Sequence, residues 1–322
     1  MIYSNVHDII LDDIFLELSG FASGIQSLLK IEGLNPAGSI KIKPAVELVD
    51  GLERAGVITT QSKLIESSSG NLGIALGIVC AEKRYPLTIV TDPNVSSQAV
   101  HIMEALGVTV KQITERDSSG GYLGSRIKFI TQELERDPDL VWLNQYANPS
   151  NSLAHRQRTA ENLHKEIGSP DLLVIGVGTS GTLMGCVEYF GVHSPSTRIV
   201  AVDSYGSVTF GTPPAQRRLP GLGTSRKPEL FKDSGTFDKL VVSEIDAIRM
   251  CRRIAREYGL LVGGSTGTAL VAAAHVAKSL PAGSRMVIIS PDLGDKYVDT
   301  IYSDSWVSTN FDKTITPIPS GA

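Results

Sequence analysis

Lys41 stands at the end of a short turn motif and could act as a nucleophile. Residues 35–41 read NPAGSIK, in which Pro36 and Gly38 indicate a turn and Ser39 is a typical helix N-cap. We expect Lys41 one turn into the following helix, near the positive end of its dipole, where the ammonium form is disfavoured. A neutral lysine amine can form a Schiff base with an aldehyde cofactor. Taken alone, however, such a lysine is more often a solvated surface charge, so the rest of the chain decides.

A serine-rich segment is a candidate anion site. Residues 66–73 read ESSSGNLG and follow a run expected to form a strand. Three hydroxyls, a glycine and the amide of Asn71 would then meet the free N–H groups at the start of a helix, which suit a carboxylate. The alternative is a plain helix cap, which would need only one of the serines.

A glycine-rich segment is compatible with two cofactors. Residues 176–182 read GVGTSGT between a strand-like run and a helix, and Asp203 ends the next strand, as in a dinucleotide site. The segment lies mid-chain, however, and Thr179, Ser180 and Thr182 fill it with hydroxyls. Hydroxyls with helix N–H groups suit a terminal phosphate monoester better than a pyrophosphate. From these residues alone, both cofactors remain open.

Two further loops are rich in polar groups. Residues 144–149 read NQYANP, and residues 263–267 read GGSTG before an alanine-rich helix. Ser265 in the second loop is either a helix cap or a contact in a binding site. The loop residues alone do not separate these two interpretations.

Short apolar, β-branched runs alternate with helical patterns from about residue 64, which predicts α/β architecture with mostly parallel sheets covered on both faces. Active sites in such folds lie at the carboxyl ends of strands, where these loops fall. The number of units predicts two sheets, with a seam near residues 145–151 and an early segment, 15–30, returning to the second domain. The expected strands are 63–66, 87–91, 108–113, 141–144, 172–177, 199–203, 240–243 and 286–290. The expected helices are 43–55, 71–83, 97–106, 121–135, 151–167, 181–190, 244–258 and 266–279.

Composition excludes several classes of protein. The 322 residues carry 30 basic and 34 acidic side chains, so no basic footprint for nucleic acid is present. Three scattered cysteines indicate reduced core residues, without the spacing of disulfides or metal ligands. The longest apolar run, residues 72–81, is too short to span a membrane, and the N-terminus lacks a basic leader. We therefore expect a cytoplasmic protein with no bound metal, and a flexible tail at 311–322.

The collinear motifs resemble those of the fold-type II pyridoxal-phosphate enzymes, the cysteine synthase and cystathionine β-synthase group. The family patterns NPxxSxK, TSGNTG, QxxNPxN, GxGTGGT, GIGxG, GxSSG and PDxGxRY correspond to residues 35–41, 68–73, 145–151, 177–182, 221–223, 263–267 and 291–297. The resemblance covers about residues 10–300 and disfavours the dinucleotide interpretation. It implies a tryptophan synthase β-like fold of two doubly wound domains in a homodimer. The smaller, mobile domain would be 35–146, and the larger would be 1–34 plus 147–310.

The resemblance implies a role for each matched position. Lys41 would form the Schiff base and move the Cα proton, Asn71 would bond the pyridine 3′ oxygen, and Ser265 would face the ring nitrogen. The cofactor phosphate would lie on Gly178, Thr179, Ser180, Gly181 and Thr182, and the substrate carboxylate on Ser68, Ser69, Gly70 and Gln145. A hydroxyl cannot stabilise a protonated pyridinium as a carboxylate does, so the cofactor would be a weaker electron sink that favours prompt β-elimination.

Departures from the sulfhydrylase pattern point to a narrower branch. Ile42 and Lys43 follow the lysine where Asp-Arg is usual, and Leu72 replaces a hydroxyl donor. The segments SIKIK and ESSSGNLGIAL resemble enzymes that join O-phospho-L-serine to L-glutamate, giving N-(2-amino-2-carboxyethyl)-L-glutamate on the route to 2,3-diaminopropionate and siderophores. The alternative is an O-phosphoserine or O-acetylserine sulfhydrylase.

A phosphate leaving group would need a cationic partner. Arg126 is the first candidate, with Tyr146 and Ser180 as additional donors. The alternative is a helix-surface arginine with no role in binding. A group of basic residues around the glycine loop at 221–223 could instead meet the carboxylates of glutamate. They are Arg217, Arg218, Arg226 and Lys227.

Overall fold

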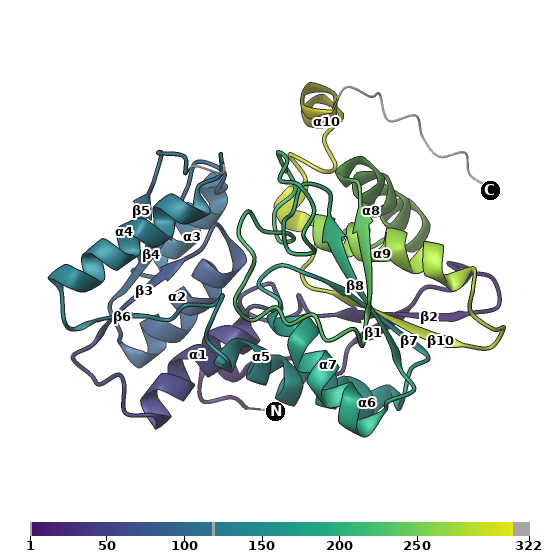
Figure 1. The fold of residues 1–322 in the computed structure, drawn as a ribbon, viewed down its shortest axis with the longest axis horizontal. Coiled ribbons are helices and arrows are strands. Elements are labelled where there is room, and N and C mark those ends of the chain that lie inside the picture. The colour runs from purple at the N-terminus through teal and green to yellow at the C-terminus, as the bar shows by residue number, and fades with distance from the viewer. Residues whose placement is uncertain (1, 118–119, 312–322) are drawn as a thin grey trace.

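Two β-sheets, each with helices on both faces, form two lobes (Figure 1). The structure is a computed structural model that describes residues 2–117 and 120–311. The first lobe holds a four-stranded, fully parallel sheet, and the second holds a six-stranded sheet with one antiparallel edge strand. The α/β class with mostly parallel sheets, predicted from the alternation of runs, is confirmed.

The four-stranded sheet alternates its buried side chains between two helical layers. Leu64 and Ile89 contribute to the core beneath α1 (Ile42–Arg54), α2 (Asn71–Lys83) and α3 (Ser97–Ala105). Ile65 and Val90 point to the other face, against α4 (Leu123–Arg136). In spatial order the strands are β5 (Thr109–Gln112), β4 (Leu87–Thr91), β3 (Lys63–Ser67) and β6 (Leu140–Trp142).

The six-stranded sheet is built in the same way. Its one face packs on α8 (Glu244–Tyr258) and α9 (Gly264–Ala277), and its other face packs on α6 (Glu161–Ile167) and α7 (Gly181–His193). In spatial order the strands are β1 (Phe15–Glu17), β2 (Gln26–Ile31), β10 (Arg285–Ser290), β7 (Leu172–Gly176), β8 (Arg198–Ser204) and β9 (Asp238–Val242). The early segment 15–30 joins this sheet as β1 and most of β2, two strands that were not among those predicted from the sequence.

The predicted helix 151–167 is wrong as a single α-helix. It consists of α5 (Ser150–Ala154), a π-helix η2 (His155–Ala160) and α6. Gly185 of α7 packs directly against this bend, because a Cβ there would lie 2.5 Å from Ser152 O and 2.6 Å from Arg156 N. A π-helical turn of this kind is uncommon and often marks a functional site.

The remaining elements are short. They are the 3-10 turns η1 (Val6–Asp8) and η3 (Asp295–Tyr297) and the helix α10 (Asp304–Asn310). The predicted flexible tail needs one correction, because the Phe311 ring packs on Trp306 with centroids 5.9 Å apart. Residues 312–322 of that tail, and Ser118 and Ser119, lie outside the described residues.

Two expectations from composition concern the core and the membrane. All three cysteines are buried and free, and burial raises the pKa of each thiol to about 12, as expected of inert core residues. Within residues 2–117 and 120–311, no helix combines the length and the apolar character needed to cross a bilayer.

Candidate active site

Lys41 lies between the two sheets, on the turn that connects β2 to α1. The Asn35 side chain donates to Glu32 O and Ser39 O at 2.8 and 3.0 Å, and so closes the turn. Ile40 N donates to Pro291 O at 2.7 Å, which ties the turn to the loop after β10. Helix α1 begins at Ile42, so the predicted placement of Lys41 one turn inside the helix is wrong and Lys41 is itself the N-cap residue.

The environment of Lys41 favours the neutral amine. Loss of hydration on burial lowers the pKa of Lys41 to about 8, and the Asp292 carboxylate opposes this shift. The cause is thus burial rather than the helix dipole that the sequence suggested. Within the described part of the chain, Lys41 Nζ makes no hydrogen bond, which leaves the amine available to react.

The lowered pKa predicts how the reactivity of Lys41 depends on pH. Only the neutral amine is nucleophilic, so acylation of Lys41 in the cofactor-free protein should rise with pH and level off above a midpoint near 8. Competitive labelling with acetic anhydride, read by peptide mass spectrometry, gives this midpoint. Exposed Lys63 is the matched control, because its Asp137 partner raises its pKa above the usual 10.5. Equal midpoints for the two lysines would contradict the assignment.

The serine-rich loop after β3 forms a cup of hydroxyl and N–H groups at the start of α2. Ser68 Oγ accepts from Gly73 N at 3.0 Å and from Gly70 N at 3.3 Å, so its own proton remains free to be donated. Ser69 is exposed at the tip of the loop. Gln145, from the loop after β6, donates through Nε2 to Ser67 O at 2.7 Å. The structure therefore brings Ser68, Gly70 and Gln145 together at one sheet edge.

Asn71 contacts the other lobe through a charged group. Its Nδ2 donates to Asp292 Oδ2 at 2.7 Å, and its Oδ1 accepts from Lys296 Nζ at 2.8 Å. Tyr297 donates to the same Asp292 oxygen at 2.6 Å. The second oxygen, Asp292 Oδ1, is buried without a hydrogen bond in the described residues, and burial raises the pKa of this carboxyl. These contacts place Asn71 beside the turn that carries Lys41, since Lys296 Nζ also donates to Gly38 O at 3.0 Å.

The glycine-rich loop between β7 and α7 has the features of a phosphate cradle. Ser180 adopts a left-handed φ of 72°, and its Oγ is buried without a hydrogen-bond partner in the described chain. Thr179 Oγ1 accepts from Asn151 Nδ2 at 3.0 Å, and the same Asn151 group donates to Gln145 O at 2.7 Å. At Gly181 a Cβ would come 2.1 Å from Asn151 Oδ1, so any side chain there would displace the Asn151 amide. An unpartnered hydroxyl at the N-terminus of a helix fits an incoming phosphate.

Ser265 lies in the first turn of α9, next to the glycine loop that follows β8. The residue is buried, and a Cβ on Gly221 would lie 3.8 Å from Ser265 Oγ. Gly221 has a φ of 89°, which permits this close approach of backbone to the hydroxyl. A flat ring between the Lys41 turn and α9 would therefore meet a hydroxyl rather than a carboxylate on the α9 side.

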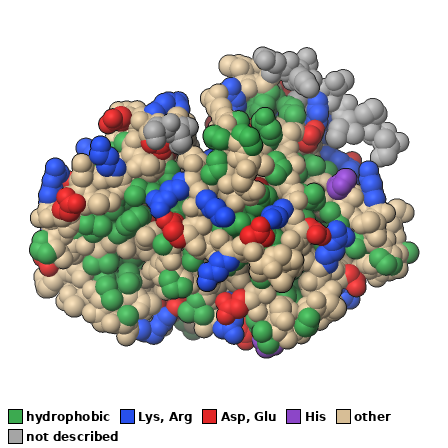
Figure 2. Space-filling model, viewed as in Figure 1, with side chains coloured by type: hydrophobic (Ala, Val, Ile, Leu, Met, Phe, Trp, Pro, Cys, Tyr) green, Lys and Arg blue, Asp and Glu red, His purple; other side chains and the backbone are tan. Residues whose placement is uncertain are grey.

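Arg126 is a buried cation at the start of α4. Only 6% of its surface is exposed, its Nη1 lies 3.5 Å from Asp92 Oδ2, and its Nε makes no hydrogen bond among the described residues. Burial raises the pKa of Tyr146, and the charge of Arg126 opposes that shift, so the two side chains interact electrostatically. The alternative of a helix-surface arginine is thus wrong, because the guanidinium is buried and keeps a spare donor among the described residues. Figure 2 shows Lys and Arg side chains gathered where the two lobes meet on this face.

Glu66 supports the serine-rich loop from beneath. It is the next-to-last residue of β3 and is fully buried, and its carboxylate accepts from Ser67 N at 2.7 Å and from Gln145 N at 3.2 Å. Burial raises the pKa of Glu66 to about 7, against the opposing effects of these N–H groups and of the charge on Arg126. Glu66 therefore links the two loops that hold Ser68 and Gln145.

The raised pKa of Glu66 predicts a pH-dependent stability. Between pH 4.5 and about 7 the folded state binds the Glu66 proton more tightly than the unfolded state, so stability falls as pH rises through this window. Glu66→Gln should remove this loss, which is at most about 3 kcal/mol. The free energy of unfolding in urea, measured at pH 5 and pH 8, should therefore fall less in the variant. An identical fall in both proteins would show that Glu66 does not titrate in this range.

Comparisons with known proteins identify the family. A family model described as "Pyridoxal-phosphate dependent enzyme" matches residues 14–292. The chain belongs to this family. Pyridoxal phosphate (PLP) is thus the cofactor, and the choice between PLP and a dinucleotide is settled.

The relatives of this PLP enzyme are close enough to compare over nearly the whole chain. Two are named N-(2-amino-2-carboxyethyl)-L-glutamate synthase. The one from Ralstonia nicotianae is 40% identical over 280 residues, and the one from Cupriavidus metallidurans is 40% identical over 283; each alignment covers 87% of this chain and 83% of the relative. The O-acetylserine dependent cystathionine β-synthase of Helicobacter pylori has a TM-score of 0.87 and 30% identity, covering 94% of this chain and 100% of that structure. The fold-type II assignment is confirmed by these likenesses.

The residues present fit PLP. The buried, unpartnered hydroxyl of Ser180 and the helix start at Gly181 suit its phosphate, and the neutral amine of Lys41 suits its aldehyde. Sequence reasoning missed the contacts of Glu66 and of His155, which bonds Thr182 in the glycine-rich loop between β7 and α7. Thr159 lies only four residues from His155, but Thr182 lies 27 residues away, so the contact with the glycine-rich loop could not be predicted from neighbouring residues.

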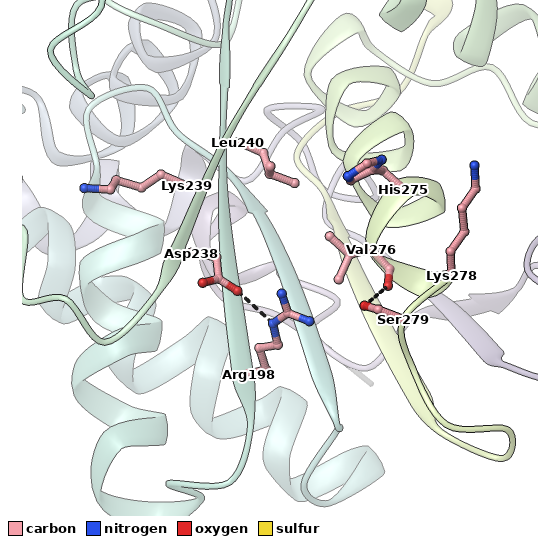
Figure 3. Close-up of a pocket in the computed structure, with 8 residues that line it drawn as sticks. All are labelled: Arg198, Asp238, Lys239, Leu240, His275, Val276, Lys278 and Ser279. Atoms are coloured by element: carbon pink, nitrogen blue, oxygen red, sulfur yellow. Dashed lines mark hydrogen bonds and ion pairs between the residues drawn. The ribbon is translucent and has the colours of Figure 1, made fainter.

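One open groove lies outside this site, between β9 and α9 (Figure 3). In it Arg198 Nε donates to Asp238 Oδ2 at 2.7 Å, and both side chains are about half exposed. Such a pair is typical of a solvated surface. The groove therefore offers none of the buried, unsatisfied groups that distinguish the site between the lobes.

Proposed function

We propose that this PLP enzyme joins O-phospho-L-serine and L-glutamate to give N-(2-amino-2-carboxyethyl)-L-glutamate and phosphate. The buried guanidinium of Arg126, with its unpartnered Nε, is the observation that carries the proposal, because a departing phosphate dianion needs such a donor. The names of the two relatives that are 40% identical support the same substrates. We further propose a cytoplasmic homodimer that serves 2,3-diaminopropionate and siderophore synthesis.

The site residues would divide the work as follows. Asn71, Ser265 and the loop from Gly178 to Thr182 would hold PLP. When bound, PLP supplies an electron sink for bonds at the amino-acid Cα. Ser68, Ser69, Gly70 and Gln145 would hold the phosphoserine carboxylate, and Arg126, Tyr146 and Ser180 would hold its phosphate.

Lys41 would move the protons of the reaction. Its neutral amine takes the Cα proton of phosphoserine as the Cβ–O bond breaks and phosphate leaves. The glutamate nitrogen then forms the new Cβ–N bond and loses a proton, after which Lys41 returns a proton to Cα. Exclusion of water and close positioning of the glutamate amine would supply much of the rate.

The sheet arrangement supports a division of the chain into two domains. All four strands from β3 to β6 belong to one sheet, and the first two and last four strands belong to the other. We propose that 35–146 is the smaller, mobile domain and that 1–34 plus 147–310 is the larger one. Closure would bring Ser68 and Gln145 onto the substrate.

Release of inorganic phosphate tests both proposed substrates, O-phospho-L-serine and the nucleophile L-glutamate. The purified holoenzyme should release phosphate from O-phospho-L-serine continuously only when a nucleophile is supplied, and fastest with L-glutamate, because the nucleophile must regenerate the enzyme. Sulfide in place of glutamate should sustain a rate lower by about tenfold or more, a specificity difference of about 1.4 kcal/mol. Faster turnover with sulfide than with glutamate would instead identify a sulfhydrylase.

A further inference from the structure

A chain of hydrogen bonds runs from the proposed phosphate loop into the protein interior. Thr182 Oγ1 lies 3.2 Å from His155 Nε2, and His155 Nδ1 lies 3.1 Å from Thr159 Oγ1. Lys43 Nζ donates to the same Thr159 oxygen at 3.3 Å. His155, Thr159 and Lys43 are all at most 1% exposed. The three interior members of this hydrogen-bond chain are therefore shielded from water, and the chain ends at a buried lysine.

Two carboxylates lie beside the buried lysine. Lys43 Nζ forms ion pairs with Asp12 Oδ1 at 2.5 Å and Glu32 Oε2 at 2.7 Å, and it donates hydrogen bonds to Glu32 Oε1 at 3.0 Å and to Thr159 Oγ1. Glu32 is also buried, and the charges of Lys43 and Lys30 keep the pKa of its carboxyl below the usual value. The ammonium group can only donate, so the bond from Lys43 to Thr159 has one possible direction.

The direction of the Lys43–Thr159 hydrogen bond fixes the direction of the hydrogen bonds that follow it. Thr159 accepts from Lys43, which leaves its single proton to be donated, and the acceptor recorded within reach is His155 Nδ1. His155 is neutral, because burial and the charges of Lys41 and Lys43 lower its pKa well below the usual value. A neutral imidazole that accepts at Nδ1 carries its proton on Nε2. His155 then donates to Thr182 Oγ1, and the Thr182 proton remains free for another acceptor.

A phosphate dianion is the acceptor that this arrangement suits. Its oxygens accept hydrogen bonds and have no proton to give, so a hydroxyl oriented as a donor is preferred over one that donates into the protein. Thr182 is partly exposed at the start of α7, whereas its partner His155 is fully buried. The opposite order would have Thr182 donate to His155 Nε2, which would leave only its lone pairs for the phosphate.

We propose that His155 is a positioning residue for the cofactor phosphate. Lys43 and Thr159 set its Nε2–H tautomer, and this tautomer orients the Thr182 hydroxyl as a donor to phosphate. The π-helical turn η2 holds His155 and Thr159 between α1 and α7, which explains its place in the fold. The inference rests on the proposed phosphate loop and is independent of which substrates the enzyme uses.

The tautomer is tested directly in the holoenzyme. Two-bond nitrogen–proton correlation spectra of protein labelled with ¹⁵N-histidine distinguish a proton on Nε2 from one on Nδ1, and comparison with His155→Gln assigns the signal. We expect a single neutral Nε2–H form for His155 that persists from pH 6 to pH 8. A proton on Nδ1 of His155 would overturn the proposal. This result does not depend on whether the variants fold or on which substrates the enzyme uses.

The effect on the cofactor is tested by equilibrium dialysis of holoenzyme variants. Thr182→Val should raise the PLP dissociation constant about 10- to 100-fold, since it deletes a hydrogen bond to a charged group. Thr159→Val should raise it about tenfold and remove the tautomer preference, while Thr159→Ser, which keeps the hydroxyl, should restore both. Thr197→Val is the matched control, because Thr197 is a buried threonine that bonds Pro170 O before β8, at the opposite edge of the sheet. Equal affinities for Thr159→Val and the wild type would overturn the proposal.

Discussion

Replacement of Lys41 by alanine is expected to lower kcat by about 10³-fold or more, because the variant loses the group that moves the Cα proton. The variant should also lose the covalent bond to PLP, and with it the yellow colour of the purified protein. Steady-state phosphate release and the visible absorbance spectrum measure the two effects. The lowered pKa of about 8 means that a larger fraction of the Lys41 amine is neutral near physiological pH than for an ordinary lysine.

The control for Lys41 is a lysine of the same lobe without a role in the site. Lys63 is half exposed and pairs with Asp137 at 2.8 Å, so Lys63→Ala should leave both kcat and the spectrum within about twofold of the wild type. Borohydride reduction of the wild type should fix phosphopyridoxyl on the peptide that contains Lys41. The same mass on another lysine peptide would refute the assignment.

Replacement of Arg126 by methionine is expected to lower kcat/KM for O-phospho-L-serine by about 100-fold. Methionine fills similar volume and carries no charge, so the phosphate would lose its cationic donor and Tyr146 would lose the neighbouring charge. Arg126→Lys should recover part of the loss, because an ammonium supplies charge without the two-pronged geometry of a guanidinium. Steady-state kinetics with phosphoserine as the varied substrate give both values.

The internal control for Arg126 is an amino-acid substrate whose leaving group is not phosphate. With O-acetyl-L-serine the same Arg126→Met protein should change kcat/KM by less than about threefold, because acetate does not need the guanidinium. This comparison separates recognition from folding, since Arg126 also lies 3.5 Å from the buried carboxylate of Asp92. An equal loss of kcat/KM with both substrates would mean that Arg126 stabilises the lobe and does not recognise the leaving group.

Most of the fold could be predicted from patterns that are local in sequence. β4, α2 and α8 begin and end at the predicted residues, because each is a strongly patterned run bounded by turn residues. β1 and β2 were not identified, since β2 is buried along nearly its whole length and lies in a segment without clear alternation. The π-helix at His155 was not predicted, and the residue that packs closely against it, Gly185, lies about 30 residues further along the chain.

Some features of the candidate site could likewise be predicted from local sequence patterns, and others could not. Loops at the carboxyl ends of strands are visible as sequence motifs, so Lys41, Ser68 and Ser180 could be singled out from their neighbours in the chain. The cause of the low pKa of Lys41 could not be predicted from the sequence, since burial depends on the whole lobe and not on the turn. Glu66 and Lys43 were missed for a related reason, because their functional contacts are with Gln145 and Thr159, far away in the sequence.

The proposal that glutamate nitrogen replaces phosphate on the serine carbon is tested most directly by following that nitrogen. The holoenzyme is mixed with O-phospho-L-serine, ¹⁵N-labelled L-glutamate and an equal concentration of sulfide, and the products are read by mass spectrometry. We predict one main product that retains the ¹⁵N atom and joins the glutamate skeleton to a 2-amino-2-carboxyethyl group. Cysteine as the main product, with no ¹⁵N in any new compound, would contradict the account.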